Sequence, residues 1–171
     1  MVRNLLLCIM IWTSGSFNYY LIAYQLKYIQ GNLYVNTIVS STSEVCAFIF
    51  SGVLINKYGL KRTLVGSYIL AIIGMSALTF DLQKTGIKML LPLCILGSKF
   101  GVACAFNVAF VSNVQLFPVS FVATSMGYCN IFSNVGTIFA PYVAELKPES
   151  ISKHIFITLC VFALLAGTNL K

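Results

Sequence analysis

The stretch KMLLPLCILGSKFGVACAFNVAFVSNVQL, residues 88–116, is a long apolar run with Lys88 and Lys99 as its only charged side chains. Runs of about 18 or more mostly apolar residues are typical of helices that cross a lipid bilayer. Clusters of charged and turn-forming residues separate this run from five similar runs elsewhere in the chain. The sequence therefore predicts an all-α, polytopic membrane protein whose single domain, residues 1–171, contains six transmembrane helices.

The expected spans cover roughly residues 5–29, 33–56, 63–80, 88–116, 119–144 and 154–170. Each is close to the roughly 20 residues that a helix needs to cross the hydrocarbon core. The connections are too short for a soluble domain, and an even number of spans puts both termini on one side of the membrane. The first run could instead be a secretory signal peptide, but it lacks a clear Ala-x-Ala cleavage site, so we expect it to remain in the mature protein.

The composition agrees with a membrane protein, because 58% of the residues are hydrophobic and 9% are charged, whereas a soluble domain has about 25% charged residues. The net charge of +7 is spread between apolar runs and forms no basic face, which argues against nucleic-acid binding. The six cysteines lack Cys-x-x-Cys spacing, so we expect buried packing residues and no metal site. No catalytic or cofactor-binding motif is present, so we expect neither an enzyme nor a cofactor.

Charge counting does not orient the chain in the membrane. The chain has 11 lysines and arginines, and the ten other than Lys99 divide equally between the two sides. The positive-inside rule needs an excess on one side. The cluster of Lys57, Lys61 and Arg62 lies in a short loop on the side of the termini, and it favours that side as cytoplasmic.

Polar side chains recur at helical spacing in four of the expected spans. A polar face in lipid must meet another helix or a watery cavity, so we expect these four spans to line a cavity and the third and sixth spans to face lipid. The stripes are Trp12, Ser16 and Tyr19 or Tyr20; Thr37, Ser41, Glu44 and Ser51; Lys99, Ala103, Phe106, Phe110 and Asn113; and Gly127, Asn130, Asn134, Thr137 and Pro141.

Glu44 and Lys99 are the two charged side chains that fall well inside expected spans. Each would cost about 2.5 to 3.5 kcal/mol at the centre of an isolated membrane helix. They are candidates for a substrate or proton pathway, in which they would act as a pair. The alternatives are a structural ion pair, or a Lys99 whose ammonium extends to the membrane surface.

Tyr19, Tyr20 and Phe106 are further candidates for a binding site, because aromatic faces attract cations and stack on flat ligands. Asn130 and Asn134 carry amides that can hydrogen-bond a ligand or bridge two helices. Ordinary helix packing is the alternative for each of these residues.

Residues 52–62, GVLINKYGLKR, resemble the glycine-rich, basic loop motif that recurs between paired helices of the major facilitator superfamily. The residues that carry the resemblance are Gly52, Asn56, Lys57, Gly59, Lys61 and Arg62. The position of the motif after the second span matches its repeat in the carboxy-terminal half of that family, between helices eight and nine. The resemblance thus implies a six-helix bundle equivalent to helices seven to twelve, with the basic loop and both termini in the cytoplasm.

A second set of residues resembles the organic ion transporter branch of that superfamily. Gln115-Leu-Phe-Pro118 is followed by Met126-Gly127 and then by the segment 134–141, NVGTIFAP. The spacing of Tyr19-Tyr20, of Glu44 and of Lys99 is also similar to that branch. The resemblance covers nearly the whole chain but only the second half of the twelve helices of the family.

The chain departs from the pattern of this branch at its charged positions. Gln115 and Val122 stand where the branch usually has an acidic and a basic residue around the gate motif, and Asn56 replaces the acidic residue of the loop. Asn134 occupies a position where cation-transporting relatives tend to have an acid and anion-transporting relatives a base. The resemblance therefore implies a weakened gate network, around Gln115 and Pro118, and leaves the substrate charge open.

The leading hypothesis is a secondary transporter of small organic ions or solutes that works by alternating access in the lipid bilayer. Glu44, Lys99, Asn134 and the stripe aromatics would contact the solute, and the 52–62 loop would secure one gated conformation. Because six spans supply one bundle, we expect a partner bundle, either a missing amino-terminal half or another chain. The alternative is a truncated, non-transporting membrane protein that assembles with or regulates a full transporter, as the lost charges would permit.

Overall fold

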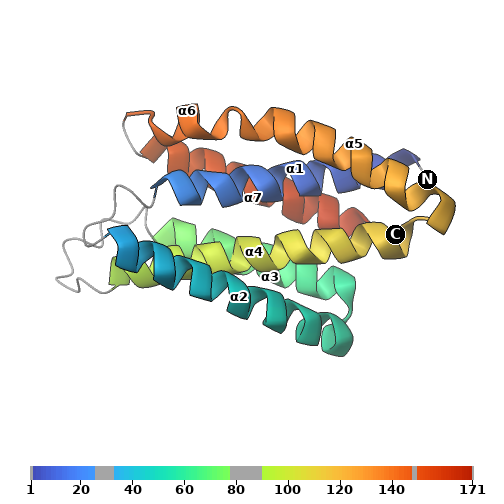
Figure 1. Cartoon of the computed structure of the whole chain (residues 1–171), viewed down its shortest axis with the longest axis horizontal. Helices are drawn as coiled ribbons and strands as arrows, with labels where there is room; N and C mark the ends of the chain where they lie inside the picture. Colours follow the sequence, from blue (N-terminus) through green and yellow to red (C-terminus); the bar gives the residue numbers. More distant parts are fainter. Residues whose placement is uncertain (1, 26–32, 78–89, 148–149, 171) are drawn as a thin grey trace.

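The computed structural model describes residues 2–25, 33–77, 90–147 and 150–170. Long helices lie side by side along one axis, and the described ranges contain no strand (Figure 1). The helices are α1 Val2–Gln25, α2 Leu33–Tyr58, α3 Leu60–Ala77, α4 Leu90–Leu116, α5 Val119–Thr137, α6 Ala140–Ala144 and α7 Ser150–Asn169. The prediction of an all-α polytopic membrane protein is confirmed.

Five of these helices are long and apolar enough to cross a membrane: α1, α2 from Thr37, α3, α4 from Leu93, and α7. One continuous span was expected over residues 119–144. The structure instead divides this segment into α5 and the short α6. Pro141 stands in the first turn of α6. Proline has no backbone N–H to donate to the preceding turn, which explains the break at Ile138 and Phe139. The expected span ends at 26–29, 78–80 and 88–89 lie outside the described residues.

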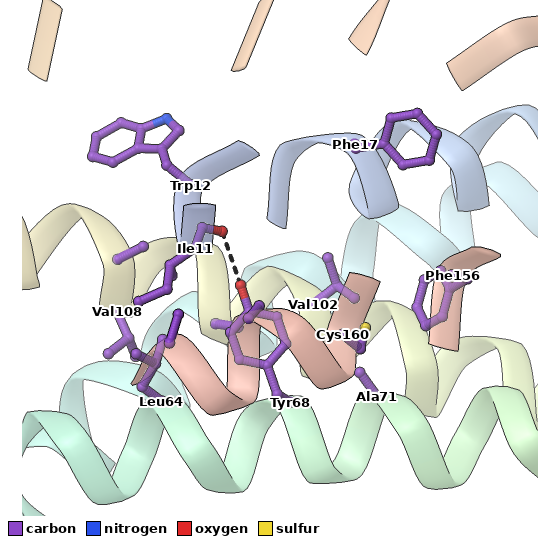
Figure 2. Packing of buried hydrophobic residues seen from close by; sticks show 14 of the residues in the cluster. Ile11, Trp12, Phe17, Leu64, Tyr68, Ala71, Val102, Val108, Phe156 and Cys160 are labelled. Atoms are coloured by element: carbon purple, nitrogen blue, oxygen red, sulfur yellow. Dashed lines mark hydrogen bonds between the residues drawn. The ribbon is translucent and has the colours of Figure 1, made fainter. Parts of the chain in front are cut away.

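The core forms around α1, which packs against α4, α5, α6 and α7. Trp12 of α1, Tyr68 of α3 and Phe156 of α7 are among its largest fully buried side chains. The Tyr68 hydroxyl donates a hydrogen bond of 3.0 Å to the carbonyl oxygen of Ile11, so its polar atom is satisfied inside the core (Figure 2). The third span was expected to face lipid, and this tyrosine of α3 was not predicted to link it to α1.

Helices α3 and α4 pack closely because each places a glycine at their crossing. A Cβ atom added at Gly101 would lie 2.7 Å from the amide nitrogen of Ala71 and 2.7 Å from the carbonyl oxygen of Ser67. A Cβ atom added at Gly74 would lie 2.8 Å from the amide nitrogen of Ser98. Small residues at a helix interface allow such close backbone contact in membranes, where lipid gives no hydrophobic drive for association.

The two chain ends lie at the same end of the bundle, together with the α2–α3 and α4–α5 turns (Figure 1). We call this the terminal end. Two basic side chains bind carbonyls at the carboxyl end of α7 there: Lys61 donates to the carbonyl oxygen of Leu170, one residue after the helix, at 3.2 Å, and Arg3 to that of Asn169 at 3.5 Å. Cations are favoured at this position because the carboxyl end of a helix carries partial negative charge. Lys27, Lys84, Lys88 and Lys171, which entered the charge count, lie outside the described residues.

Candidate functional site

Glu44 of α2 and Lys99 of α4 form an ion pair inside the bundle. The Lys99 Nζ lies 2.5 Å from Glu44 Oε1, and the side chains are 6% and 16% exposed respectively. Lys99 is nine residues from the start of α4 and Glu44 is eleven from the start of α2, or about 14 and 17 Å along their helix axes at roughly 1.5 Å per residue. Both charges therefore lie well inside helices long and apolar enough to cross a membrane, away from the helix ends.

Two hydroxyl groups complete the polar contacts of the pair. Tyr19 of α1 donates a hydrogen bond of 2.7 Å to Glu44 Oε2, and the Lys99 ammonium donates to the Ser40 hydroxyl. Lys99 Nζ also lies 5.4 Å from the centre of the Tyr19 ring, within the range of a cation–π contact. Three helices, α1, α2 and α4, thus meet at four polar side chains, which we call the Glu44–Lys99 cluster: Tyr19, Ser40, Glu44 and Lys99.

The hydroxyl on α2 that reaches Lys99 is Ser40 and not Ser41, which the polar stripe had included. Ser40 is one helical turn before Glu44, so the two side chains share a face. Ser41 is exposed on the adjacent side of α2, whereas Ser40 is buried.

Aromatic rings from α1 and α4 form a wall beside this cluster. Phe106 stands two turns after Lys99 on α4, and its ring is stacked on Tyr19 with centroids 6.5 Å apart. Trp12 contacts Phe106 edge-on at 5.9 Å and Phe110 at 4.1 Å. The wall joins an ion pair to flat apolar surfaces, an arrangement suited to an organic ion.

Three sequence candidates do not belong to the cluster, although Tyr20 contacts one of its members. Tyr20 is exposed, and its ring contacts that of Tyr19, with the ring centroids 5.5 Å apart. Asn130 and Asn134 are exposed on the outer face of α5. Among the residues that the structure describes, neither amide contacts Glu44 or Lys99. The Glu44–Lys99 cluster itself is assembled from α1, α2 and α4, without α5.

Other polar contacts between helices did not emerge from the sequence. Asn107 Nδ2 donates to the Ser51 hydroxyl at 2.6 Å, which links α4 to α2. The Ser125 hydroxyl donates to Asn113 Oδ1 at 3.0 Å, which links α5 to α4. An amide inside an apolar run signals that a partner is needed, but the partner is a common serine on another helix. Only the three-dimensional arrangement selects which serine it is.

Comparison with known proteins identifies the family of this chain. The family model described as Major Facilitator Superfamily matches residues 4–170. The chain belongs to the major facilitator superfamily. The match covers nearly the whole chain, which agrees with the resemblance found in the loop and gate motifs.

Individual relatives in the superfamily are named as transporters. A putative transporter of Caenorhabditis elegans is 32% identical over 136 residues, which are 80% of this chain and 27% of the relative. Organic cation/carnitine transporter 4 of Arabidopsis thaliana is 29% identical, over 87% of this chain and 28% of its own length. Organic cation/carnitine transporter 2 of Homo sapiens is 24% identical, over 82% and 25%. The predicted organic ion transporter branch is confirmed, and the chain spans about a quarter of these relatives.

The superfamily loop motif forms the tight turn between α2 and α3. Gly59 has a φ angle of 83°, a left-handed conformation that favours glycine, and its amide donates to the Ile55 carbonyl at 2.9 Å. Lys61 binds the end of α7, and Lys57 lies over the Tyr58 ring at 5.4 Å. The remaining motif residues, Gly52, Asn56 and Arg62, are exposed.

The gate motif marks the turn between α4 and α5. Gln115 is exposed in the last turn of α4, and Pro118 is the residue that precedes α5, with an extended backbone. Both motifs of the superfamily therefore lie at the terminal end of the bundle.

The cysteines are unpaired, and four of the six are buried. The expectation of buried packing residues was wrong for Cys46, which is exposed on α2, and Cys94 is half-buried. In the described ranges, no group of three or more His, Cys, Asp or Glu side chains is placed to hold a metal ion.

Proposed function

We propose that this chain acts as the carboxy-terminal six-helix bundle of a secondary transporter, which moves a small organic ion or solute by alternating access. The observation that carries this proposal is the Glu44–Lys99 ion pair inside the bundle, beside the aromatic wall of Trp12, Tyr19 and Phe106. Intramembrane charges mark substrate and ion pathways in membrane proteins. The names of the relatives, organic cation/carnitine transporters, support the same class of solute.

Exchange of ion-pair partners gives the cluster a way to bind and release a charged solute. The Glu44 carboxylate is more exposed than the Lys99 ammonium, so a solute reaches the carboxylate first. A positively charged group would then take over part of the Lys99 contact, while the ring of Tyr19 supports the cation. Ser40 would keep the displaced ammonium hydrogen-bonded. We therefore propose a solute that carries a positive charge.

The outer face of α5 supports the need for a second bundle. Asn130 and Asn134 are exposed one turn apart on this helix. Amide groups are costly in contact with lipid, so this face suits a water-filled cavity between two bundles. Alternating access would then rock the two bundles about the Glu44–Lys99 cluster.

The test is uptake of a radiolabelled quaternary ammonium ion by cells that produce this chain with or without a candidate amino-terminal bundle. We expect uptake only when both bundles are present, and its loss with Glu44→Gln. Glu145→Gln is the matched control, because Glu145 is an acid at the opposite end of the bundle from the termini and outside the cluster. Uptake that is unchanged by Glu44→Gln, at equal surface expression, would remove Glu44 from the mechanism. Uptake by the chain as a monomer would refute the need for a partner.

A non-transporting protein that assembles with a full transporter is the second candidate. It is favoured by the neutral side chains of Asn56 and Gln115, both exposed at the terminal end, where they cannot form a charged gate. The same cells separate the two functions. If this chain co-purifies with the partner bundle but uptake does not appear, an assembly role is supported over transport.

A further inference from the structure

A groove of about 320 Å³ lies between α2, α3 and α4, the three helices that run side by side at one flank of the bundle (Figure 1). Its lining residues recur at intervals of four on each helix. They are Leu54 and Tyr58 of α2; Arg62, Thr63, Gly66, Ser67 and Leu70 of α3; and Phe100 and Cys104 of α4. These intervals put one continuous face of each helix in the groove.

The groove is polar at one end and apolar along its length. Arg62 and Tyr58 stand beside the α2–α3 turn at the terminal end. Leu70 is eight residues further along α3, about 12 Å deeper at roughly 1.5 Å per residue. The Thr63 hydroxyl donates to the carbonyl oxygen of Gly59 in the α2–α3 turn, and the Ser67 hydroxyl donates to that of Thr63, at 2.8 Å each, so they leave no free donor on the wall. A ligand that fits needs an anionic head and an apolar tail.

The charge around the mouth of the groove is positive. Arg62 is exposed and has no ion-pair partner among the described residues. Lys57 in the last turn of α2 and Lys61 in the first turn of α3 lie close to it in the sequence, and no carboxylate of the described ranges lies at the terminal end. Basic pockets between membrane helices are typical sites for anionic lipid headgroups.

The groove is separate from the Glu44–Lys99 cluster. Lys99 and Phe100 are neighbours on α4, so their side chains leave the helix about 100° apart. Lys99 points to α1 and α2, where it contacts Tyr19 and Glu44, whereas Phe100 lines the groove with α3. A ligand in the groove would therefore not occupy the cluster.

We propose that this groove binds one anionic phospholipid, with its phosphate on Arg62 and one acyl chain along Gly66, Leu70 and Phe100. Gly66 has no atom within 4 Å of a Cβ position, so the middle of the groove is open to the chain. Arginine suits a phosphate because its planar guanidinium donates two parallel hydrogen bonds. The site is independent of the proposed transport, because no residue of the Glu44–Lys99 cluster lines it.

The test is native mass spectrometry of the purified chain, titrated with palmitoyl-oleoyl phosphatidylglycerol or with the matching phosphatidylcholine. We expect tighter binding of phosphatidylglycerol, and a roughly ten-fold loss of that preference with Arg62→Gln, on the scale of one charge-assisted hydrogen bond. Arg3→Gln is the matched control, since it removes an arginine from the same end of the bundle but outside the groove, and the lipid preference of this variant should stay within about two-fold of the parent chain. Equal effects of the two substitutions would show general surface charge and overturn the proposal.

Gly66→Leu tests the acyl chain separately. The added side chain should fill the groove and abolish retention of both lipids, while helicity and monodispersity stay at the level of the parent chain. Glycerol 3-phosphate should fail to displace the lipid; displacement would show a site for free phosphate compounds instead. Lipid binding that survives Gly66→Leu would overturn the proposal. Lipid binding that disappears when a partner bundle is co-produced would also overturn it, because the groove would then be a contact between bundles.

Discussion

Glu44 and Lys99 are stable in the bundle because each neutralises the other where lipid would penalise a single charge. Removing one partner leaves the other buried and unpaired, which costs about 3–5 kcal/mol in proteins. We expect Glu44→Gln and Lys99→Met each to lower the free energy of unfolding by roughly that amount. The double variant should lose less than the sum of the two. The measurement is a double-mutant cycle in mixed detergent–dodecyl sulfate micelles.

The double-mutant cycle also tests the structure of the cluster. Coupling between residues in contact is about 0.5–3 kcal/mol, whereas distant residues are additive within roughly 0.5 kcal/mol. Additive losses for Glu44→Gln and Lys99→Met would mean that the ion pair does not form.

Tyr19 and Tyr20 are adjacent tyrosines with different environments, which makes them a matched pair. Tyr19→Phe removes the hydroxyl that donates to Glu44 at 2.7 Å but keeps the ring beside Lys99 and Phe106. We expect it to cost about 1–2 kcal/mol of unfolding free energy, between the values for membrane and charged hydrogen bonds. Tyr20→Phe, at an exposed position, should change little. Equal losses, measured in the same micelles, would contradict the hydrogen bond to Glu44.

At this scale the sequence predicted the charges of the cluster but not all of their partners. Glu44 and Lys99 are conspicuous because apolar runs surround them, and a buried charge requires an opposite one. Ser40 and Ser41 differ by about 100° in helix phase, and only the packing of α2 against α4 decides which of them faces Lys99. Asn130 and Asn134 were expected to bind a ligand or bridge two helices; their amides are exposed on α5, so the structure leaves them open to a ligand.

The contact of α3 with α4 depends on backbones that approach one another at glycines. Gly101→Ala would place a Cβ atom 2.7 Å from two backbone atoms of α3, which cannot rotate away. We expect a loss of about 1–3 kcal/mol, the usual cost of an overpacked core. Gly97→Ala, one turn earlier on α4 with nothing within 4 Å, is the control and should be neutral or stabilising. Thermal unfolding in detergent compares them, and equal stability of the two variants would contradict the close crossing.

Helix positions followed from the apolar runs, but the internal break of one element did not. Span 119–144 reads as continuous because its length suits a bilayer, yet Pro141 ends the hydrogen-bond ladder and separates α5 from α6. The close packing of α3 on α4 could not be predicted from the sequence either. Nothing in the sequence distinguishes Gly74 and Gly101 from a glycine such as Gly66, whose Cβ position has no neighbouring atom within 4 Å. What distinguishes them is the neighbouring helix, a long-range property.

For the molecule as a whole, the outward face of α5 shows which of its surfaces suit lipid and which suit a partner bundle. This helix exposes two neighbouring stripes, one polar with Asn130 and Asn134, and one apolar with Ile131 and Val135. Lipid satisfies the apolar stripe, whereas the amides need water or polar partners. The two stripes should therefore face different surroundings in the membrane.

Single cysteines at the neighbouring positions 134 and 135 test this division. In cells that contain a partner bundle, a membrane-impermeant thiol reagent should label Asn134→Cys quickly, because a thiolate in a water-filled cavity is the reactive form. Val135→Cys should be labelled slowly, although Val135 is also exposed, because lipid excludes the reagent. Cys46 is exposed in the parent chain, so both substitutions are made with Cys46→Ser. Equal labelling rates would mean that both stripes have the same surroundings, and α5 would then not line a cavity.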